Sequence, residues 1–400
     1  MAEQPGRAGL DARDETLGQE SVQGASVRAA VMQSFAVDRL DWRNAILIPG
    51  LAIFSALVIG GLIIMATGSS FSDVLNAYRA LFMGAFGSWR AISETLVAAT
   101  PLILAGLAVA LAFRAGLFNI GGEGQILIGG LFAVILGFSI SGVPAPLHIT
   151  LALLGGVLGG AIWGAIPGYL KAKTGAHEVI TTIMLNFIAL RLLDYLLLRS
   201  FIQREGRNDP VSESILPSAQ LPRFLTPVDP SLRVHIGIFI AIAIAALTQW
   251  LLFRTKLGFE MRAVGANPVA AKYAGINVGR SYVITMAIAG GMAGVAGALQ
   301  ILGVLGRATP GFSARLGFDG IAVALLGRSN PYGVVLAALL FGALRAGGQE
   351  MQATANVGID IIAVIQALII IFVAAPALIR AIYRVKASSA QAPISKGWSG

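Results

Sequence analysis

The chain has 400 residues, of which 56% are hydrophobic and only 12% are charged, and its mean hydropathy is +0.78. Soluble domains carry roughly 25% charged residues, so this composition excludes a soluble globular protein and indicates an integral membrane protein. The net charge is +9, but the basic residues lie mostly between apolar runs, which argues against a nucleic-acid partner. The absence of cysteine excludes disulfides and thiolate metal sites, and three scattered histidines do not suggest a metal enzyme.

The two ends of the chain differ from its middle. Residues 1–44 are polar and contain no apolar run of the signal-peptide type, so we expect a disordered cytoplasmic N-terminal extension. Residues 381–400 are expected to form a cytoplasmic C-terminal tail. The membrane-spanning domain is therefore predicted over 45–380.

Ten apolar runs approach or reach the roughly 20 residues that a helix needs to cross about 30 Å of hydrocarbon. They cover residues 45–67, 91–112, 124–140, 147–170, 179–202, 234–253, 281–304, 317–328, 331–347 and 357–378. The eighth and ninth runs are short and flank Arg328-Ser329-Asn330-Pro331, which predicts a broken or re-entrant pair. Lys and Arg are more numerous on the side of the N-terminus, so both termini are expected in the cytoplasm. The predicted fold is an all-α integral membrane protein of about ten transmembrane helices.

The stretch Arg114–Gln125, RAGLFNIGGEGQ, places polar residues and four glycines at the edge of the hydrocarbon. Non-helical polar backbone survives there only inside protein or beside a water-filled cavity, and transporters use such interrupted helices to build the substrate path. Asn119, Glu123 and Gln125, together with Asn186 in the fifth run, offer donors and acceptors suited to a neutral, hydroxyl-rich ligand. Alternatively, Asn119 and Glu123 only cap helix ends at the break.

Ionisable residues within the apolar runs are informative because a charge inside a bilayer is costly. Arg191 and Asp194 lie three residues apart on one predicted helix, so we expect them to pair as a structural element. Five carboxylates have no evident local partner: Glu94, Glu123, Glu178, Asp319 and Asp360.

Small residues recur every four positions in two of the runs. Such spacing forms a groove that lets helices approach closely, so we expect a packing role for both sets. The first set is Gly156, Gly160, Gly164 and Gly168, and the second is Ala289, Ala293 and Gly297.

Two connecting segments stand out. Residues 203–232 contain several prolines and mixed charges and are expected outside the cell, as an external contact surface or a plain connection. Residues 254–280 are too polar to span and are expected inside. In that segment Asn267 is a plausible N-cap, Pro268 suits the first helical position and Gly275 follows the end, which predicts a short helix over 268–273. Such a helix could receive force from a motor, or could be an ordinary loop helix.

No G-x-x-x-x-G-K-[ST] phosphate loop occurs in the chain. We therefore expect no ATP hydrolysis by this chain and no enzyme activity of its own. Either a partner supplies the energy, or transport follows an ion gradient or runs downhill.

Four stretches resemble permeases of ATP-binding-cassette (ABC) importers in the ribose/branched-chain amino acid superfamily. They are FRAGLFNIGGEGQILIGG (113–130), HEVITTIMLNFIA (177–189), LGFEMRAVGANPVAAKYAGI (257–276) and GFDGIAVALLGRSNPYG (317–333). The first is most similar to the nucleoside-type subfamily, where Gly-Leu-Phe-Asn-Ile-Gly-x-Glu-Gly-Gln is typical. The resemblance covers about 45–380.

This resemblance implies two pseudo-symmetric helical halves around a translocation path, and a coupling helix within 257–276 that docks on an ATPase. The implied path residues, which line or brace the path, are Asn119, Glu123, Gln125, Asn186 and Asp319. The implied coupling residues are Glu260, Arg262, Gly265, Asn267 and Pro268.

The resemblance also implies the partners and the location. We expect an ABC ATPase subunit, which would use the ATP, a second homologous permease subunit and an extracytoplasmic substrate-binding protein. Membrane lipid is expected around the spans, in the cytoplasmic (inner) membrane, with neither nucleic acid nor a cofactor bound to the chain itself. The leading hypothesis is import of nucleosides by alternating access. The alternatives are the same machine carrying a simple sugar or related small polar solute, and a stand-alone gradient-driven carrier.

Overall fold

The computed structural model describes residues 42–355 and 359–385, and the described chain is helical apart from turns, loops and one isolated bridge between Gln203 and Ser212. Eight of its helices are long and apolar enough to cross a membrane, and two shorter apolar helices accompany them. In chain order the elements are α2 (Trp42–Ala66), α3 (Phe71–Phe86), α4 (Trp89–Arg114), α5 (Gly122–Ser139), α6 (Ala145–Thr174), α7 (Glu178–Leu197), η1 (Pro217–Ala219), α8 (Gly237–Arg254), α9 (Lys256–Ala266), α10 (Pro268–Tyr273), α11 (Val278–Gln300), η2 (Ile301–Leu305), α12 (Leu316–Leu326), α13 (Pro331–Ala355), α14 (Ile359–Ala374) and α15 (Pro376–Tyr383).

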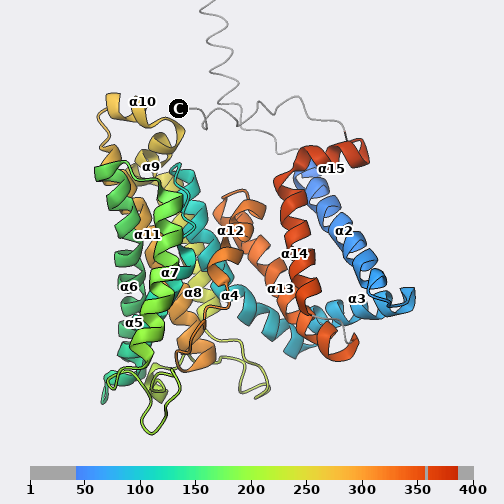
Figure 1. Cartoon of the computed structure of the whole chain (residues 1–400), viewed down its shortest axis with the longest axis horizontal. Coiled ribbons are helices and arrows are strands. Elements are labelled where there is room, and N and C mark those ends of the chain that lie inside the picture. Colours follow the sequence, from blue (N-terminus) through green and yellow to red (C-terminus); the bar gives the residue numbers. More distant parts are fainter. Residues whose placement is uncertain (1–41, 356–358, 386–400) are drawn as a thin grey trace, which may run out of the picture.

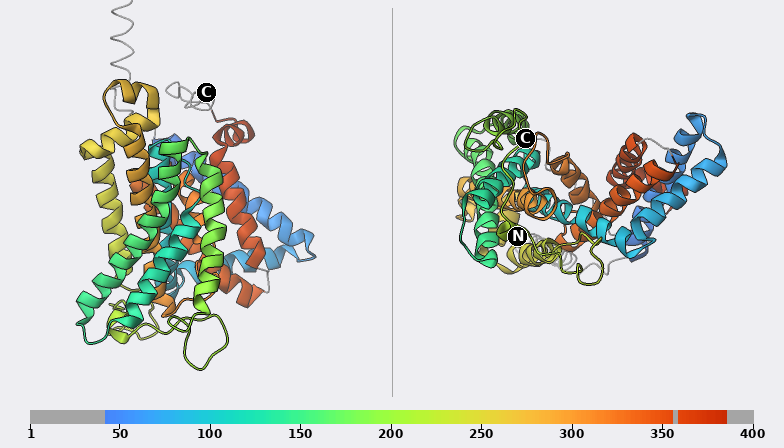
Figure 2. Two further views of the ribbon diagram at one scale, coloured as in Figure 1. Left: turned by 60° about the vertical axis from the view of Figure 1, so that its left-hand side comes forward. Right: turned by 90° about the horizontal axis from the view of Figure 1, so that it is seen from below.

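The helices form two groups that α4 and α13 join (Figure 1). α5 to α8 and α11 stand together on one side, and α2, α3, α14 and α15 stand on the other (Figures 1 and 2). α4 is apolar around its circumference and is the most buried of the spanning helices, as expected for a helix in the centre of a bundle.

Glycines let α6 and α11 pack with their backbones in contact, which confirms the packing role predicted for the glycines of α6. A Cβ added to Gly160 would lie 2.2 Å from the carbonyl oxygen of Gly290, and one added to Gly294 would lie 2.1 Å from that of Gly156. The facing residues on α11 are therefore Gly290 and Gly294. Gly297 of the set predicted for that helix instead packs on α5, where an added Cβ would lie 2.1 Å from the carbonyl oxygen of Ile126.

The eighth predicted run forms a broken crossing, as expected, whereas the ninth, expected to be short, belongs to α13, a continuous helix of 25 residues. After η2 the chain re-enters the bundle as a loop over 306–315, in which Phe312 packs on Gly130 of α5. It then continues as α12, which has only 11 residues. A second break follows over 327–330, where Arg328 and Ser329 both have positive φ angles. α12 is thus a half-length helix held between two irregular segments inside the protein.

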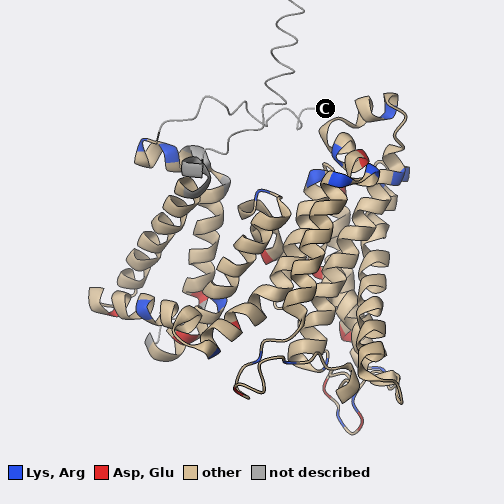
Figure 3. Ribbon diagram, turned by 180° about the vertical axis from the view of Figure 1, so that it is seen from behind, with Lys and Arg blue, Asp and Glu red and all other residues tan. Residues whose placement is uncertain are grey.

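Lys and Arg gather at the end of the molecule that carries α9 and α10 (Figure 3). By the positive-inside rule this end is cytoplasmic, and α15 lies at the same end (Figure 1). The loops between α7 and α8 lie at the opposite end.

Three helices and one boundary differ from the sequence-based expectation. The last apolar run was expected to reach 378 and the tail to begin at 381, but α14 ends at Ala374 and a separate helix, α15, covers Pro376–Tyr383. α3 was not expected because its 16 residues are too few to span the membrane and include Asp73 and Arg79. α9 lies in a segment for which only the next helix was predicted. α2 begins at Trp42, so the last three residues of the expected N-terminal extension are helical. The rest of that extension, and all of the expected tail beyond 385, lie outside the described residues.

Candidate functional site

The break between α4 and α5 is the centre of the candidate site. α4 ends at Arg114, and Gly116 takes a φ of +70°, a conformation that favours glycine. The amide of Leu117 then donates to the carbonyl of Ala112 at 2.9 Å, in the pattern that closes many helix C-termini. Residues 115–121 therefore form a short irregular connection before α5 begins.

Three amide side chains hold this connection in shape. Asn119 and Gln125 are fully buried and exchange two hydrogen bonds of 3.0 Å each. Asn186 of α7 accepts from the amide of Gly124 at 2.8 Å and donates to the carbonyl of Ile120 at 2.9 Å. Buried amides need such partners, because a buried polar group without one is costly. The structure therefore shows these three residues bracing the break, and direct contact with a ligand stays a prediction.

Glu123 joins the two broken regions of the protein. Its carboxylate accepts a hydrogen bond from the hydroxyl of Ser313, and a second from the amide of Gly317 at 2.8 Å. Gly317 lies in the first turn of α12, where a carboxylate is favourable. A Cβ on Gly317 would lie 2.1 Å from the amide nitrogen of Glu123, so only glycine allows this approach.

Asp319 does not join that cluster. Its carboxylate pairs instead with Arg345 of α13, which also donates to the carbonyl of Ala314 at 3.2 Å. The other acidic residues singled out above mostly have partners as well. Lys171 pairs with Glu178 at 2.5 Å, Arg233 with Glu94 at 3.2 Å, and Arg191 with Asp194 at 3.5 Å across an exposed surface.

The predicted helix over 268–273 is confirmed as α10. The side chain of Asn267 accepts from the amides of Val269 and Ala270, both at 3.0 Å, and Pro268 occupies the first helical position. Gly275 follows with a φ of +82°. Val269 and Tyr273 are among the most exposed apolar side chains of the molecule, as expected of a helix that presents a face to a partner.

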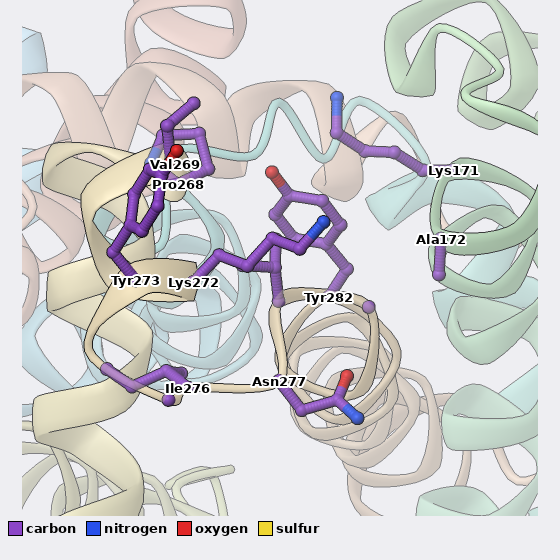
Figure 4. A pocket seen from close by; sticks show the side chains of 12 residues that line it. Lys171, Ala172, Pro268, Val269, Lys272, Tyr273, Ile276, Asn277 and Tyr282 are labelled. Carbon is purple, nitrogen blue, oxygen red and sulfur yellow. The ribbon is translucent and has the colours of Figure 1, made fainter.

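A cavity of about 1040 Å³ opens between α10, the start of α11 and the end of α6 (Figure 4). Lys171 and Lys272 extend toward it from α6 and α10, and Tyr282 rises between them from α11 (Figure 4). The ammonium of Lys171 lies 5.4 Å from the ring centre of Tyr282. This cytoplasmic face is thus basic and hollowed, which suits a protein partner.

α9 sits directly on the break. A Cβ on Gly265 would lie 2.4 Å from the carbonyl oxygen of Arg114 and 2.8 Å from the amide nitrogen of Gly116. The guanidinium of Arg262 donates to the carbonyl of Leu252 at 3.0 Å and lies 5.2 Å from the ring centre of Phe253. These contacts fix α9 both to the end of α8 and to the turn after α4.

Arg114 extends the same chain of contacts to α12. Its guanidinium lies 5.7 Å from the ring centre of Phe253, the ring that Arg262 also approaches, and its Nε donates to the carbonyl of Ser329 at 2.9 Å. Ser329 belongs to the break that ends α12. Of the other predicted coupling residues, Glu260 only approaches Lys256 at 3.9 Å on the surface.

Sequence reasoning missed Arg345 and Ser313, which satisfy the carboxylates of Asp319 and Glu123. An arginine within an apolar run is itself a signal of a buried partner, so Arg345 could have been found. Ser313 lies in a loop without a distinctive pattern, and nothing in the sequence pointed to it.

These features define a class: a multi-pass α-helical component of a membrane transporter. The family model described as "Branched-chain amino acid transport system / permease component" matches residues 91–374. The chain belongs to this family of permeases and is therefore a multi-pass protein of the cytoplasmic membrane.

Curated relatives cover most of the chain. It is 42% identical to the guanosine ABC transporter permease protein NupP of Bacillus subtilis, over 84% of this chain and 94% of that protein. It is 37% identical to the glucose ABC transporter permease protein TsgB13 of Haloferax volcanii, over 81% and 86%. It is 36% identical to the nucleoside ABC transporter permease protein NupB of Lactococcus lactis, over 82% and 90%. A second Bacillus subtilis permease, NupQ, matches at 29% identity over 63% of this chain and 79% of that protein. No solved structure matches the chain significantly.

Proposed function

We propose that this chain is a permease subunit of an ABC importer that moves nucleosides across the cytoplasmic membrane by alternating access. The observation that carries the proposal is the seating of α9 on the break after α4, within a chain that resembles nucleoside permeases over more than four-fifths of its length. A partner that moves α10 would move the membrane-embedded break through the close backbone contacts that Gly265 allows.

The path for this movement runs through named contacts. A displacement of α10 would displace α9, which directly precedes it in the chain. Gly265 of α9 packs on the backbone of Arg114 and Gly116, so the turn after α4 would move with it. The hydrogen bond from Arg114 to Ser329 connects the turn to the end of α12, and the hydrogen bond from Gly317 to Glu123 connects the start of α12 to α5. Because closely packed interfaces shift between discrete arrangements, a small displacement at the docking face can reorient a half-length helix.

The proposal needs three partners. A separate ABC ATPase would hydrolyse ATP and dock on α10 and its surrounding face, since the sequence carries no phosphate loop. A second, related permease would complete the path. This expectation is supported by the presence of two permeases with guanosine-transporter names, NupP and NupQ, in one organism. An external binding protein would deliver the ligand. No cofactor is proposed for this chain.

Nucleosides are the leading substrate because NupP, at 42% identity, is named a guanosine permease and NupB a nucleoside permease. A simple sugar is the second candidate, and the specific observation in its favour is the 37% identity to the glucose permease TsgB13.

The test is to purify the chain with its tagged candidate ATPase and second permease, and to reconstitute the complex with binding protein in liposomes. We expect adenosine or guanosine to stimulate ATP hydrolysis and uptake, and glucose to have no effect. If glucose alone stimulated ATP hydrolysis and uptake, the substrate would be a simple sugar and not a nucleoside. A chain that binds no ATPase, yet catalyses uptake, would overturn the importer mechanism.

Arg262→Ala adds a test of the coupling route. It removes the contacts with Leu252 and Phe253 and should reduce nucleoside-stimulated ATP hydrolysis, whereas Lys256→Ala alters only an exposed side chain and should leave it unchanged. Equal rates for both variants and the wild type would remove Arg262 from the mechanism.

A further inference from the structure

A second cavity, of about 590 Å³, lies among α12, α13 and α14 and is separate from the cytoplasmic one. Its volume falls within the range of small-molecule sites, which are about 300–1,000 Å³. The polar side chains that line it are Arg315, Asp319, Arg345, Gln349, Asp360 and Gln366. Phe318 and Phe341 supply aromatic surface beside them.

The charges of the cavity point to a neutral ligand. It is lined by two arginines and two aspartates, so it carries no net charge, and Asp319 already pairs with Arg345. A phosphate group would require an excess of basic groups. Asp360 has no ion pair among the described residues, so its carboxylate can accept hydrogen bonds from hydroxyl groups.

Gln366 provides an independent sign of a missing partner. Its amide nitrogen is buried and makes no hydrogen bond within the part of the chain that the structure describes. A buried donor without a partner is destabilising, so its presence calls for an explanation such as a bound water, ion or ligand. Gln366 itself lines the cavity, so a rotation of its side chain would turn this buried N–H toward a ligand acceptor.

The backbone at the edge of the cavity is also unusual. Ala314 and Arg315 are consecutive non-glycine residues with φ angles of +46° and +65°. Strain of this kind clusters at ligand sites and switch regions. These two residues lie immediately before α12, the helix whose far end Arg114 holds through Ser329.

We propose that this cavity is the permease's own transient site for the transported nucleoside. The ribose hydroxyls would donate to Asp360, an acceptor on the ligand would take the free N–H of Gln366, and the heterocycle would lie against Phe318. This inference rests on the proposed function and deepens it. It differs from the expected path set, in which Asn119 and Gln125 bond to each other and Asn186 bonds to the backbone of Gly124 and Ile120.

The position of the cavity links binding to the ATPase. Its wall includes α12, which is tied to α5 through Gly317 and to the coupling segment through Arg114. A shift of α12 that follows ATP binding would therefore change the cavity itself. The shift of α12 that opens the path would therefore also weaken binding in this cavity.

The absence of cysteine makes a direct test simple, since one introduced thiol is unique. Ala363 lies in the cavity wall and is exposed, and Ala66 is an exposed alanine at the end of α2. Cells that express the complete transporter with Ala363→Cys or Ala66→Cys are treated with N-ethylmaleimide, with or without saturating adenosine. We expect adenosine to slow labelling of Ala363→Cys at least about threefold, as occupancy of a site requires, and adenosine 5′-monophosphate to have no effect. Labelling of Ala66→Cys should not change.

A second pair of variants keeps the test independent of cysteine reactivity. Gln366→Leu removes the free donor, and Gln249→Leu makes the same change at another span residue with a buried, unpartnered amide atom. At equal membrane levels we expect adenosine uptake to fall about tenfold for Gln366→Leu, while Gln249→Leu stays near the wild type.

The outcomes separate the two proposals. A wild-type chain that imports no nucleoside overturns the proposed function and this inference together. Active wild-type uptake with no protection at Ala363→Cys, or with equal uptake by Gln366→Leu and Gln249→Leu, overturns this inference alone. Protection by adenosine monophosphate as strong as by adenosine would overturn the assignment to a neutral ligand.

Discussion

Replacing Gly265 with alanine perturbs the contact on which the coupling route depends. The added Cβ would lie 2.4 Å from the carbonyl oxygen of Arg114, whereas real Cβ atoms essentially never come closer than 3.0 Å. α9 or the turn must therefore move by at least about 0.6 Å, and the neighbouring atoms are backbone that cannot rotate away. Overpacking of this kind costs about 1–3 kcal/mol. We expect lower thermal stability and weaker coupling.

The assay is nucleoside-stimulated ATP hydrolysis and uptake by the reconstituted complex, with melting of the purified permease in parallel. Gly291→Ala is the matched control, because its Cβ would make an ordinary 3.4 Å contact with the side chain of Val157, away from the cavity of the docking face. We expect Gly265→Ala to retain basal ATP hydrolysis and lose most uptake. Wild-type uptake and melting for Gly265→Ala would refute the claim that this glycine transmits force.

Three further predictions follow from buried contacts. Gly290→Ala would place a Cβ 2.2 Å from a carbonyl of α6 and should lower the melting temperature, whereas Gly291→Ala, with its nearest atom at 3.4 Å, should not; equal melting would contradict the packing account. Asn186→Leu leaves the backbone amide of Gly124 and the carbonyl of Ile120 buried without a partner, and should lower the free energy of unfolding by about 2 kcal/mol or more. Denaturant unfolding measures this change, and an unchanged midpoint would show that the break does not depend on Asn186. Burial and two nearby arginines lower the pKa of His235 to about 4 in the folded protein. As the pH falls below 6.5, this histidine therefore binds a proton in the unfolded state but stays neutral in the folded state. The free energy of unfolding of the wild type should therefore fall by about 2 kcal/mol between pH 7 and pH 5, and His235→Gln should abolish this fall. A variant with the same pH dependence as the wild type would disprove the assignment to His235.

Local patterns predicted the parts of this protein that local forces determine. The capped helix over 268–273 was predicted correctly because Asn267, Pro268 and Gly275 each act within a few residues. Eight of the ten apolar runs correspond to helices long enough to cross a membrane, because a crossing demands a minimum apolar length, and the other two correspond to the shorter apolar helices α12 and α14. α3 was not predicted because its apolar residues lie on one face of a helix that is too short to span the membrane.

The contacts that build the candidate site join residues far apart in the chain. Glu123 meets Ser313 and Gly317, and Arg114 meets Ser329, across about 190 to 215 positions. No spacing rule relates such residues, since tertiary packing alone brings them together. The family motif indicated that the break mattered, but it did not reveal that the amides of the break bond to one another.

The most direct test of the account is uptake of radiolabelled adenosine and uridine by cells with and without this gene, with excess ribose as competitor. We predict uptake that disappears with the gene, returns with the wild-type copy and is unaffected by ribose. Unchanged nucleoside uptake in the deletion strain, together with loss of labelled sugar uptake, would contradict the nucleoside assignment.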